Sequence, residues 1–393
     1  MARKRRSNKP KRIAIAIELD FPFPHHYDCC RGIQRYADER GGWLTVIDPH
    51  LVGMAGQAGA AEYDGVVGRI GLRAAEAAKA HGIPAVNHWL NSPAKDLPCV
   101  FADFREGGRI AGEHLLARGF RHFGHLGMTH DRGYPLELAG FEQAIKAQGL
   151  EAPRRLSTPR NFESSPEVFA RFRKAVHQWL AGLTPPVGIL VSNEIVARYL
   201  AQICRELNLR VPLDVGIVAE YDTHMVSLGI EPSLSSVDQD FERIGYRAAR
   251  LLDRLMSSRP KPPKKPILIK PRGLTVRASS DAFVVADPLA AKALRFIADH
   301  ARDAVTVEDV AKHLHTTTRT LARRFKEFLG RAASDEINRL RTEYIKRRLE
   351  DPDIRLGDLA VECGFHSPSH FALFFRKMTG LRPKDYRSHS ANK

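Results

Sequence analysis

The sequence lacks any long apolar run. No stretch of its 393 residues approaches the ~20 consecutive apolar residues that are needed to cross a bilayer. The basic N-terminus, MARKRRSNKPKR, leads into only a short apolar segment and shows no small-residue cleavage site of a secretory signal. We therefore expect a cytoplasmic protein that does not associate with a membrane, and this expectation disfavours an exported transport binding protein.

Cysteine is scarce. The five cysteines are odd in number, scattered, and include no Cys-x-x-Cys pair, which predicts reduced thiols rather than a disulfide or zinc framework. Cys29 and Cys30 lie near His25 and His26, so contact with a metal or redox sensing is one interpretation. The other is that these residues only begin a helix, since two adjacent cysteines do not easily face one site. We expect neither a metal nor a cofactor.

Motifs of common enzymes are also missing. The sequence has no phosphate-binding GxxxxGK(S/T), no GxGxxG after a strand, no HExxH and no GxSxG. We therefore predict that the protein is not an enzyme.

Acidic residues are absent from two segments. Residues 1–12 and 259–277 each contain seven Lys or Arg and no Asp or Glu, and residues 287–393 contain twenty-one basic against fifteen acidic residues, in a chain of net charge +16. This uneven distribution is typical of proteins that bind a polyanion and predicts double-stranded DNA as a partner, which would place the protein at the nucleoid when bound. For the N-terminal tail, simple solvated charge is the alternative.

Residues 13–258 alternate short β-branched runs with helical patterns. Strands are predicted at 13–17, 44–47, 65–67, 122–126, 189–191 and 215–218, and helices at segments such as 107–118 and 242–256. Alternation of strands and helices predicts an α/β domain whose parallel sheets are covered by helices on both faces.

Ligands of such domains bind beyond the carboxyl ends of the strands, where polar side chains of this sequence gather. The polar residues at these positions are Glu18, Asp20, Arg69, Asp103, Ser192, Asn193, Glu194, Glu220, Tyr221, Asp222, Asp238 and Gln239. Side chains of this kind suit a small hydroxyl-rich molecule, whose oxygens need donors and acceptors. Each is equally consistent with a helix N-cap, because Asp and Ser also cap the helix that follows a strand.

The C-terminal segment contains an internal duplication. Residues 307–330 align with residues 357–380, apolar with apolar at most key positions. The aligned pairs are Val310 with Ala360, Ala311 with Val361, Leu321 with Phe371, Phe325 with Phe375, and Gly330 with Gly380. Each copy predicts a helix (307–314; 356–363), a short turn and a second helix that is opened by Thr317 or Ser367 as N-cap.

The second helix of each copy predicts one buried and one free face. In the first copy the free face carries Arg319, Arg323 and Lys326, and a short helix with a basic face fits the major groove of DNA. A helix predicted at 334–349 spans about 24 Å and is long enough to hold two such helices about one DNA turn apart. A helical bundle with a solvated basic face is the alternative.

These features predict the following organisation: a basic tail at 1–12, a ligand-sensing domain at 13–275, a linker at 276–286, an all-α DNA-binding domain at 287–388 and a short tail at 389–393. The proline-rich segment RPKPPKKP at 259–266 disfavours helix and sheet, and a short strand is predicted at 267–269.

The segment from Cys363 to Arg387 closely resembles the signature of AraC-type regulators. Residues 107–116, 210–215 and 234–239 resemble the sensor core of LacI/GalR-type regulators, which share the two-lobed periplasmic-binding-protein fold. The pairing of both parts resembles the AraC/XylS-family regulators of the xylose-operon-regulator type, and this resemblance spans nearly the whole chain.

The resemblance implies a transcription regulator that binds a sugar-like effector between two lobes, forms a homodimer through the sensor, and acts mostly as an activator that works with RNA polymerase. The base-facing positions it implies are Arg319, Ala322 and Arg323 in the first copy and Pro368, Ser369 and Ala372 in the second. Thr317, Lys326, Ser367, His370, Arg376 and Lys377 complete the predicted DNA-binding set.

The sequence departs from the families that it resembles at three positions, two in the sensor and one in the DNA-binding part. Glu137 stands where sugar-binding relatives commonly place an arginine, and it joins the candidate ligand-binding residues. Tyr221 replaces the first acid of the usual strand-end pair, and Leu373 stands where many AraC-type members carry arginine. Replacing Arg by Glu reverses a charge and turns a donor into an acceptor, so we predict an effector other than xylose: another sugar, a sugar acid or an amino sugar.

Overall fold

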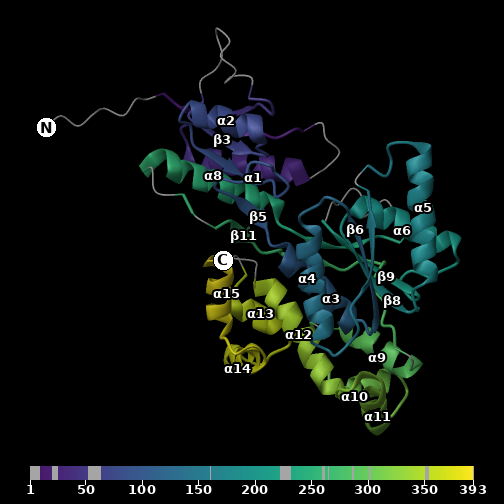
Figure 1. The fold of residues 1–393 in the computed structure, drawn as a ribbon. Helices are drawn as coiled ribbons and strands as arrows, with labels where there is room; N and C mark the ends of the chain where they lie inside the picture. The colour runs from purple at the N-terminus through teal and green to yellow at the C-terminus, as the bar shows by residue number, and fades with distance from the viewer. Residues whose placement is uncertain are drawn as a thin grey trace.

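The computed structural model describes residues 9–19, 25–51, 63–159, 161–221, 232–258, 262–263, 265–285, 287–300, 302–349 and 354–392. Figure 1 shows two α/β lobes above a helical region that carries the C-terminus. Within the described part of the chain, every helix is too short or too polar to traverse a bilayer.

The first lobe is built on a four-stranded sheet in the order β2-β1-β3-β4. The strands β1 (Lys11–Ala16), β2 (Trp43–Ile47), β3 (Gly65–Gly68) and β4 (Ala85–Asn87) all pair in parallel. Ile13 and Ile15 of β1 pack against α1 (His25–Arg40) and α8 (Phe241–Ser258), whereas Ala14 and Ala16 face the core of α2 (Leu72–Ala80). Helix α8 comes from late in the sequence, so the chain crosses between the lobes more than once.

The second lobe is built on a six-stranded sheet in the order β12-β10-β9-β8-β6-β7. Its strands are β6 (His122–Met128), β7 (Arg154–Thr158), β8 (Val187–Val191), β9 (Val215–Glu220), β10 (Ser235–Asp238) and β12 (Gly273–Thr275). Only the edge strand β12 pairs antiparallel among these described strands. Both faces are covered: Leu115 and Phe141 lie in the core under α3 (Phe104–Ala117) and α4 (Tyr134–Lys146), and Val176 and Leu200 lie under α5 (Pro166–Ala181) and α6 (Glu194–Glu206).

A short sheet of β5 (Val100–Ala102) and β11 (Ile267–Ile269) lies where the chain passes between the lobes. The predicted strand at 267–269 is therefore confirmed. The predicted α/β architecture with parallel sheets is confirmed as well.

The C-terminal region is entirely helical where it is described. Its helices are α9 (Pro288–Asp299), α10 (Val307–His313), α11 (Thr318–Leu329), α12 (Ala333–Leu349), α13 (Leu356–Glu362), α14 (Pro368–Thr379) and α15 (Pro383–Asn392). Two separate cores form, one around Leu321 and Phe325 and the other around Phe371 and Phe375. Helix α12 contributes Ile337 to the first core and Ile345 and Leu349 to the second, which explains how one helix joins two copies of the same unit.

Candidate ligand pocket and DNA-reading helices

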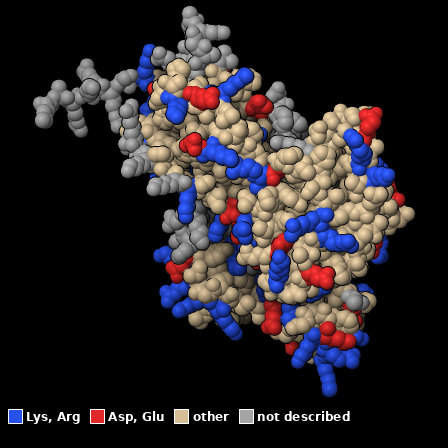
Figure 2. Space-filling model, viewed as in Figure 1, with Lys and Arg blue, Asp and Glu red and all other residues tan. Residues whose placement is uncertain are grey.

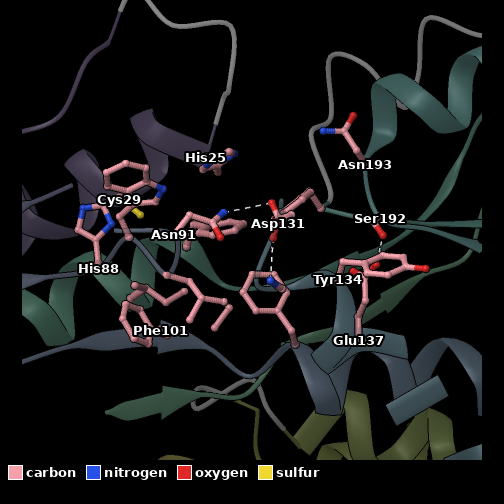
Figure 3. A pocket seen from close by; sticks show the side chains of 18 of the residues that line it. His25, Cys29, His88, Asn91, Phe101, Asp131, Tyr134, Glu137, Ser192 and Asn193 are labelled. Atoms are coloured by element: carbon pink, nitrogen blue, oxygen red, sulfur yellow. Dashed lines mark hydrogen bonds between the residues drawn. The ribbon is translucent and has the colours of Figure 1, made fainter. Parts of the chain in front are cut away.

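A cavity opens between the two lobes, with side chains from both around it (Figure 3). Its walls come from the ends of β3, β4, β6, β8 and β9 and from the first turns of α1, α3, α4 and α8, which is the position expected of a ligand site in parallel α/β domains. The residues around it are His25, Cys29, Arg69, His88, Trp89, Leu90, Asn91, Phe101, Ala102, Phe104, Met128, Asp131, Gly133, Tyr134, Glu137, Ser192, Asn193, Tyr221, Phe241 and Ile244.

Aromatic rings form much of the first-lobe side of the cavity. The Arg69 guanidinium lies 4.7 Å from the centre of the Trp89 ring, a cation–π arrangement. The His25 ring stacks on Tyr221 at 5.4 Å and lies 4.8 Å from Phe241. Flat faces of this kind suit the C–H face of a sugar ring as well as other small organic molecules.

Tyr221 has an unusual backbone. Its φ is 72°, in the left-handed region that bulky residues rarely adopt. Strain of this kind persists where the surroundings enforce it, and it is concentrated at ligand-binding positions. The conformation therefore supports the prediction that Tyr221 belongs to the site.

Polar contacts join the lobes beside the cavity. Asn91 Nδ2 donates to Asp131 Oδ2 at 3.2 Å, and the Arg132 guanidinium donates to the Leu90 carbonyl at 2.7 Å. Asp131 Oδ1 also accepts from the backbone N–H of Gly133 at 2.7 Å, which fixes the Asp131 carboxylate just before the start of α4. Figure 3 shows Asp131 next to Asn91 within the cavity.

Glu137 lies on the second-lobe side in a buried polar trio. Its Oε1 is 3.0 Å from His125 Nε2 and also accepts from the Ser192 hydroxyl. Burial raises the pKa of Glu137 well above its usual value and lowers the pKa of His125 to about 3. Both shifts favour the uncharged forms, a protonated carboxyl and a neutral imidazole, and a protonated carboxyl is able both to accept and to donate a hydrogen bond.

The structure places five of the predicted polar residues around the cavity: Arg69, Glu137, Ser192, Asn193 and Tyr221. Asp103 instead caps α3 by accepting from the Glu106 N–H at 3.2 Å, as the alternative interpretation predicted. The Glu18 side chain is exposed and does not line the cavity.

Two further candidates, Glu194 and Gln239, are buried but do not line the cavity. Glu194 opens α6 next to Asn193, which lines the cavity, and Gln239 donates to Glu220. Asp20 and Asp222 lie outside the described residues.

Sequence reasoning missed most of the aromatic wall and two polar residues, Asn91 and Asp131. Asp131 was within reach of the strand-end argument, because it comes three residues after β6 ends at Met128. The rings of His25, Trp89 and Tyr134 gave no comparable signal, since isolated aromatic residues are more often core than site.

Cys29 also lines the cavity, and burial raises the pKa of its thiol. Among the described residues, no group of three or more His, Cys, Asp or Glu side chains is arranged to hold a metal ion.

The first copy of the duplicated unit folds as predicted. Thr306 and Asp309 form a capping box at the start of α10, and the Thr317 hydroxyl caps α11 by accepting from the Thr320 N–H at 3.1 Å. Leu321 and Phe325 face the core. The exposed side chains of α11 include Arg319, Ala322, Arg323 and Lys326, with Thr317 before the first turn.

Helix α14 repeats this arrangement. Ser367 caps it by accepting from the His370 N–H at 3.2 Å, and Phe371 and Phe375 are buried. Its exposed side chains include Pro368, Ser369, His370, Arg376 and Lys377, whereas Ala372 is half-buried. Leu373 is 67% exposed, which makes the outer face of α14 less basic than that of α11.

The predicted DNA-facing cations are available to a partner. Within the described part of the chain, no ion pair engages Arg319, Arg323, Lys326, Arg376 or Lys377. The neighbouring Arg324 differs, because it faces Asp287 at 3.6 Å and Glu327 at 3.8 Å. Figure 2 shows Lys and Arg side chains projecting from the lower part of the molecule, where the helical region lies.

Two protein families match this chain. Residues 113–280 match a family described as a periplasmic binding protein-like domain, and residues 310–389 match a helix-turn-helix domain. The xylose operon regulatory protein of Escherichia coli (strain K12) is 27% identical over 274 residues, which cover 70% of this chain and 69% of that protein. Its counterpart from Haemophilus influenzae is 31% identical over 209 residues, which cover 53% of this chain and 54% of that protein.

Solved structures share the fold. The structure of the xylose-binding transcription activator xylR matches with a TM-score of 0.59 and 23% identity, and it covers 97% of this chain and 98% of its own. The complex of the transcriptional regulator CelR with cellobiose matches with a TM-score of 0.55 and 20% identity over 70% of this chain and 86% of its own. The chain is thus a DNA-binding transcription regulator, not an enzyme, that joins a periplasmic-binding-protein-like domain to a helix-turn-helix domain and is similar to the regulators of the xylose-operon type.

Proposed function

We propose that this regulator binds a sugar in the cavity between its lobes and that binding alters its affinity for operator DNA. The observation that carries the proposal is the presence, in one chain, of a polar and aromatic cavity between two α/β lobes and of two helices, α11 and α14, with exposed basic residues. The names of the xylose-binding and cellobiose-bound structures support a sugar as the ligand. Residues 13–275 are the sensing domain, 276–286 the linker and 287–388 the DNA-binding domain in this proposal.

The chemistry of the cavity favours a ligand that donates hydrogen bonds. Asp131 and Glu137 supply carboxyl oxygens as acceptors, and Arg69 is held against Trp89. A sugar acid would place its carboxylate against Asp131, whereas a neutral or amino sugar presents hydroxyl or ammonium donors. We infer that the effector is a neutral or amino sugar other than D-xylose.

A thermal-shift screen tests the effector. D-xylose, D-galactose, D-glucosamine and D-galacturonate are compared at equal concentration, because a ligand of the native state raises the melting temperature. A larger shift with galactose or glucosamine than with xylose is the expected result, and the largest shift with D-xylose would overturn the choice of ligand. Glu137→Gln should weaken the shift, while Glu76→Gln on the exposed surface of α2 should leave it unchanged.

The DNA-facing residues act in two ways in this proposal. Arg319, Ala322 and Arg323 of α11 read base edges in one major groove, and Pro368, Ser369 and Ala372 of α14 fit the next one by shape. The phosphates are held by Thr317, Lys326, Ser367, His370, Arg376 and Lys377. A gel-shift assay of the full chain on the upstream region of its own operon tests this: binding at low salt that weakens with added salt is expected, and no binding at low salt would contradict it.

We also propose a homodimer through the first lobe and activation through RNA polymerase. Strand β2 is an edge strand, and on it Leu44 and Ile47 are 45% and 51% exposed. Apolar residues on an open strand edge suit pairing with a second copy. Sedimentation should therefore show a dimer for the parent and a monomer for a variant with Leu44→Glu and Ile47→Lys; equal masses would exclude this interface.

Transcription in vitro with purified RNA polymerase tests activation, and a fall in transcript on adding the sugar-bound regulator would make it a repressor.

A further inference from the structure

We infer that Arg118, at the end of α3, is a positioning residue that clamps the first helix-turn-helix unit to the second lobe, so that ligand-driven movement of the lobes is passed to α11. This inference rests on the proposed function, because it concerns how the occupied cavity reaches the DNA. Helix α3 contacts the ligand cavity at one end and the segment before the DNA-binding domain at the other.

One end of α3 belongs to the ligand cavity. Phe104 in its first turn lines the cavity and meets the Tyr221 ring edge-on at 6.2 Å. Helix α4 starts at the same wall, with Tyr134 and Glu137 around the cavity. A ligand that contacts these side chains therefore acts on α3 and α4 together.

The two helices are packed too closely to slide past each other. A Cβ atom at Gly108 would lie 1.9 Å from the Glu137 carbonyl oxygen, and one at Gly140 would lie 1.8 Å from the Arg105 carbonyl oxygen. The backbones of α3 and α4 are thus in direct contact at two points, Gly108 and Gly140. Close-packed interiors transmit displacement instead of absorbing it, so α3 and α4 move as one body with the second lobe.

The other end of α3 holds the segment that leads into the DNA-binding domain. The Arg118 carbonyl accepts from the Val284 N–H at 2.7 Å, and its guanidinium pairs with Asp281 at 3.1 Å and lies 4.5 Å from the centre of the Phe283 ring. One turn earlier, His114 Nε2 is 2.7 Å from the Ser280 hydroxyl. The Arg118 side chain is only 11% exposed, whereas its partner Asp281 is 39% exposed, so the arginine is the buried half of the pair.

The contact continues into the first helix-turn-helix unit. Asp281 also pairs with Arg295 of α9 at 3.0 Å, so one carboxylate links α3 to α9. Helix α9 shares its core with α11 through Leu294 and Phe325, on the helix that carries Arg323. The second unit, in contrast, is joined to the first through α12 and through Gly364, whose backbone lies close to Ala304 in the loop between α9 and α10. The first unit therefore moves with the second lobe when the lobes move about the cavity.

The test compares Arg118→Ala with Arg173→Ala in the full-length protein. Arg173 is a matched control, because it also pairs with an acid on the second lobe, Glu206, but lies on α5 away from the linker. Hydrogen exchange without any sugar tests the clamp itself. Exchange of the Val284 amide should rise roughly tenfold or more in Arg118→Ala alone, and unchanged protection would overturn the clamp.

The second arm measures coupling as the ratio of operator Kd values without and with sugar, using D-galactose, D-glucosamine and D-xylose in turn. Arg118→Ala should keep the thermal shift given by the sugar and keep DNA binding, but bring the Kd ratio close to one; Arg118→Lys should restore part of the ratio. A parent ratio that persists in Arg118→Ala would overturn the inference and leave the proposed function standing. If no sugar changes the parent Kd, the proposed function fails, and hydrogen exchange alone decides the clamp.

Discussion

Replacing Gly108 by alanine should weaken the second lobe sharply. The new Cβ would lie 1.9 Å from the Glu137 carbonyl oxygen, so α3 and α4 must separate by about 1 Å before the contact becomes tolerable. That movement loosens the core around Leu115 and Phe141. Overpacking of this kind costs about 1–3 kcal/mol, and we expect the upper end here because the obstacle is backbone that no rotamer change can move.

Gly357→Ala is the matched control. Gly357 also lies in a helix, α13, but has open space where a Cβ would be placed, so alanine there should stabilise the chain by about 0.5–1 kcal/mol through its better helix propensity. Urea unfolding followed by circular dichroism measures both. Opposite signs are expected, and a Gly108→Ala variant as stable as the parent would refute the close packing on which the α3–α4 body depends.

Three further outcomes follow from named contacts. Arg323→Ala should relax base preference by about 1–3 kcal/mol at one base pair. Lys377→Ala should weaken the salt dependence instead, by reducing the magnitude of the negative slope of log K against log salt by about 0.9. Competition binding across sequences and salt concentrations separates the two effects. The pKa of His125 is depressed to about 3, so its contribution to stability is present above the unfolded pKa near 6.5 and is lost as pH falls toward 3. Between pH 7.5 and pH 5 the parent should therefore lose about 2 kcal/mol more unfolding free energy than His125→Gln, and equal losses would place His125 in contact with water. Thr306→Ala removes the hydroxyl half of the capping box of α10, in which the Thr306 side chain accepts from the Asp309 N–H, and leaves the backbone N–H of residue 306 bonded to Asp309. This loss should cost about 1 kcal/mol in urea unfolding, while an unchanged midpoint would mean that the hydroxyl cap contributes nothing.

The repeating and periodic features of the fold could be predicted from the sequence. Ile13 and Ile15 alternate with Ala14 and Ala16, and the structure buries the two sets on opposite faces of the first sheet. The duplication between residues 307–330 and 357–380 likewise predicted two helix-turn-helix units, because local caps such as Thr317 and Ser367 define where each helix begins.

The cavity was harder to predict because its wall is assembled from segments far apart in the chain. His25 and Tyr221 are separated by almost two hundred residues, yet their rings stack. The strand-end rule located Arg69 and Tyr221 but could not separate a ligand contact from a helix cap such as Asp103. The clamp at Arg118 gave no sequence signal at all, since a single arginine at a helix end is ordinary.

The most direct test of the account is the affinity of the full-length protein for its own upstream DNA, measured by fluorescence anisotropy with and without the sugar that gives the largest thermal shift. We expect salt-dependent binding whose Kd changes severalfold with the sugar, and weaker preference at one base pair in Arg323→Ala. A Kd that is identical with and without every sugar that stabilises the protein would contradict a ligand-controlled regulator, and no binding at low salt would contradict a DNA reader.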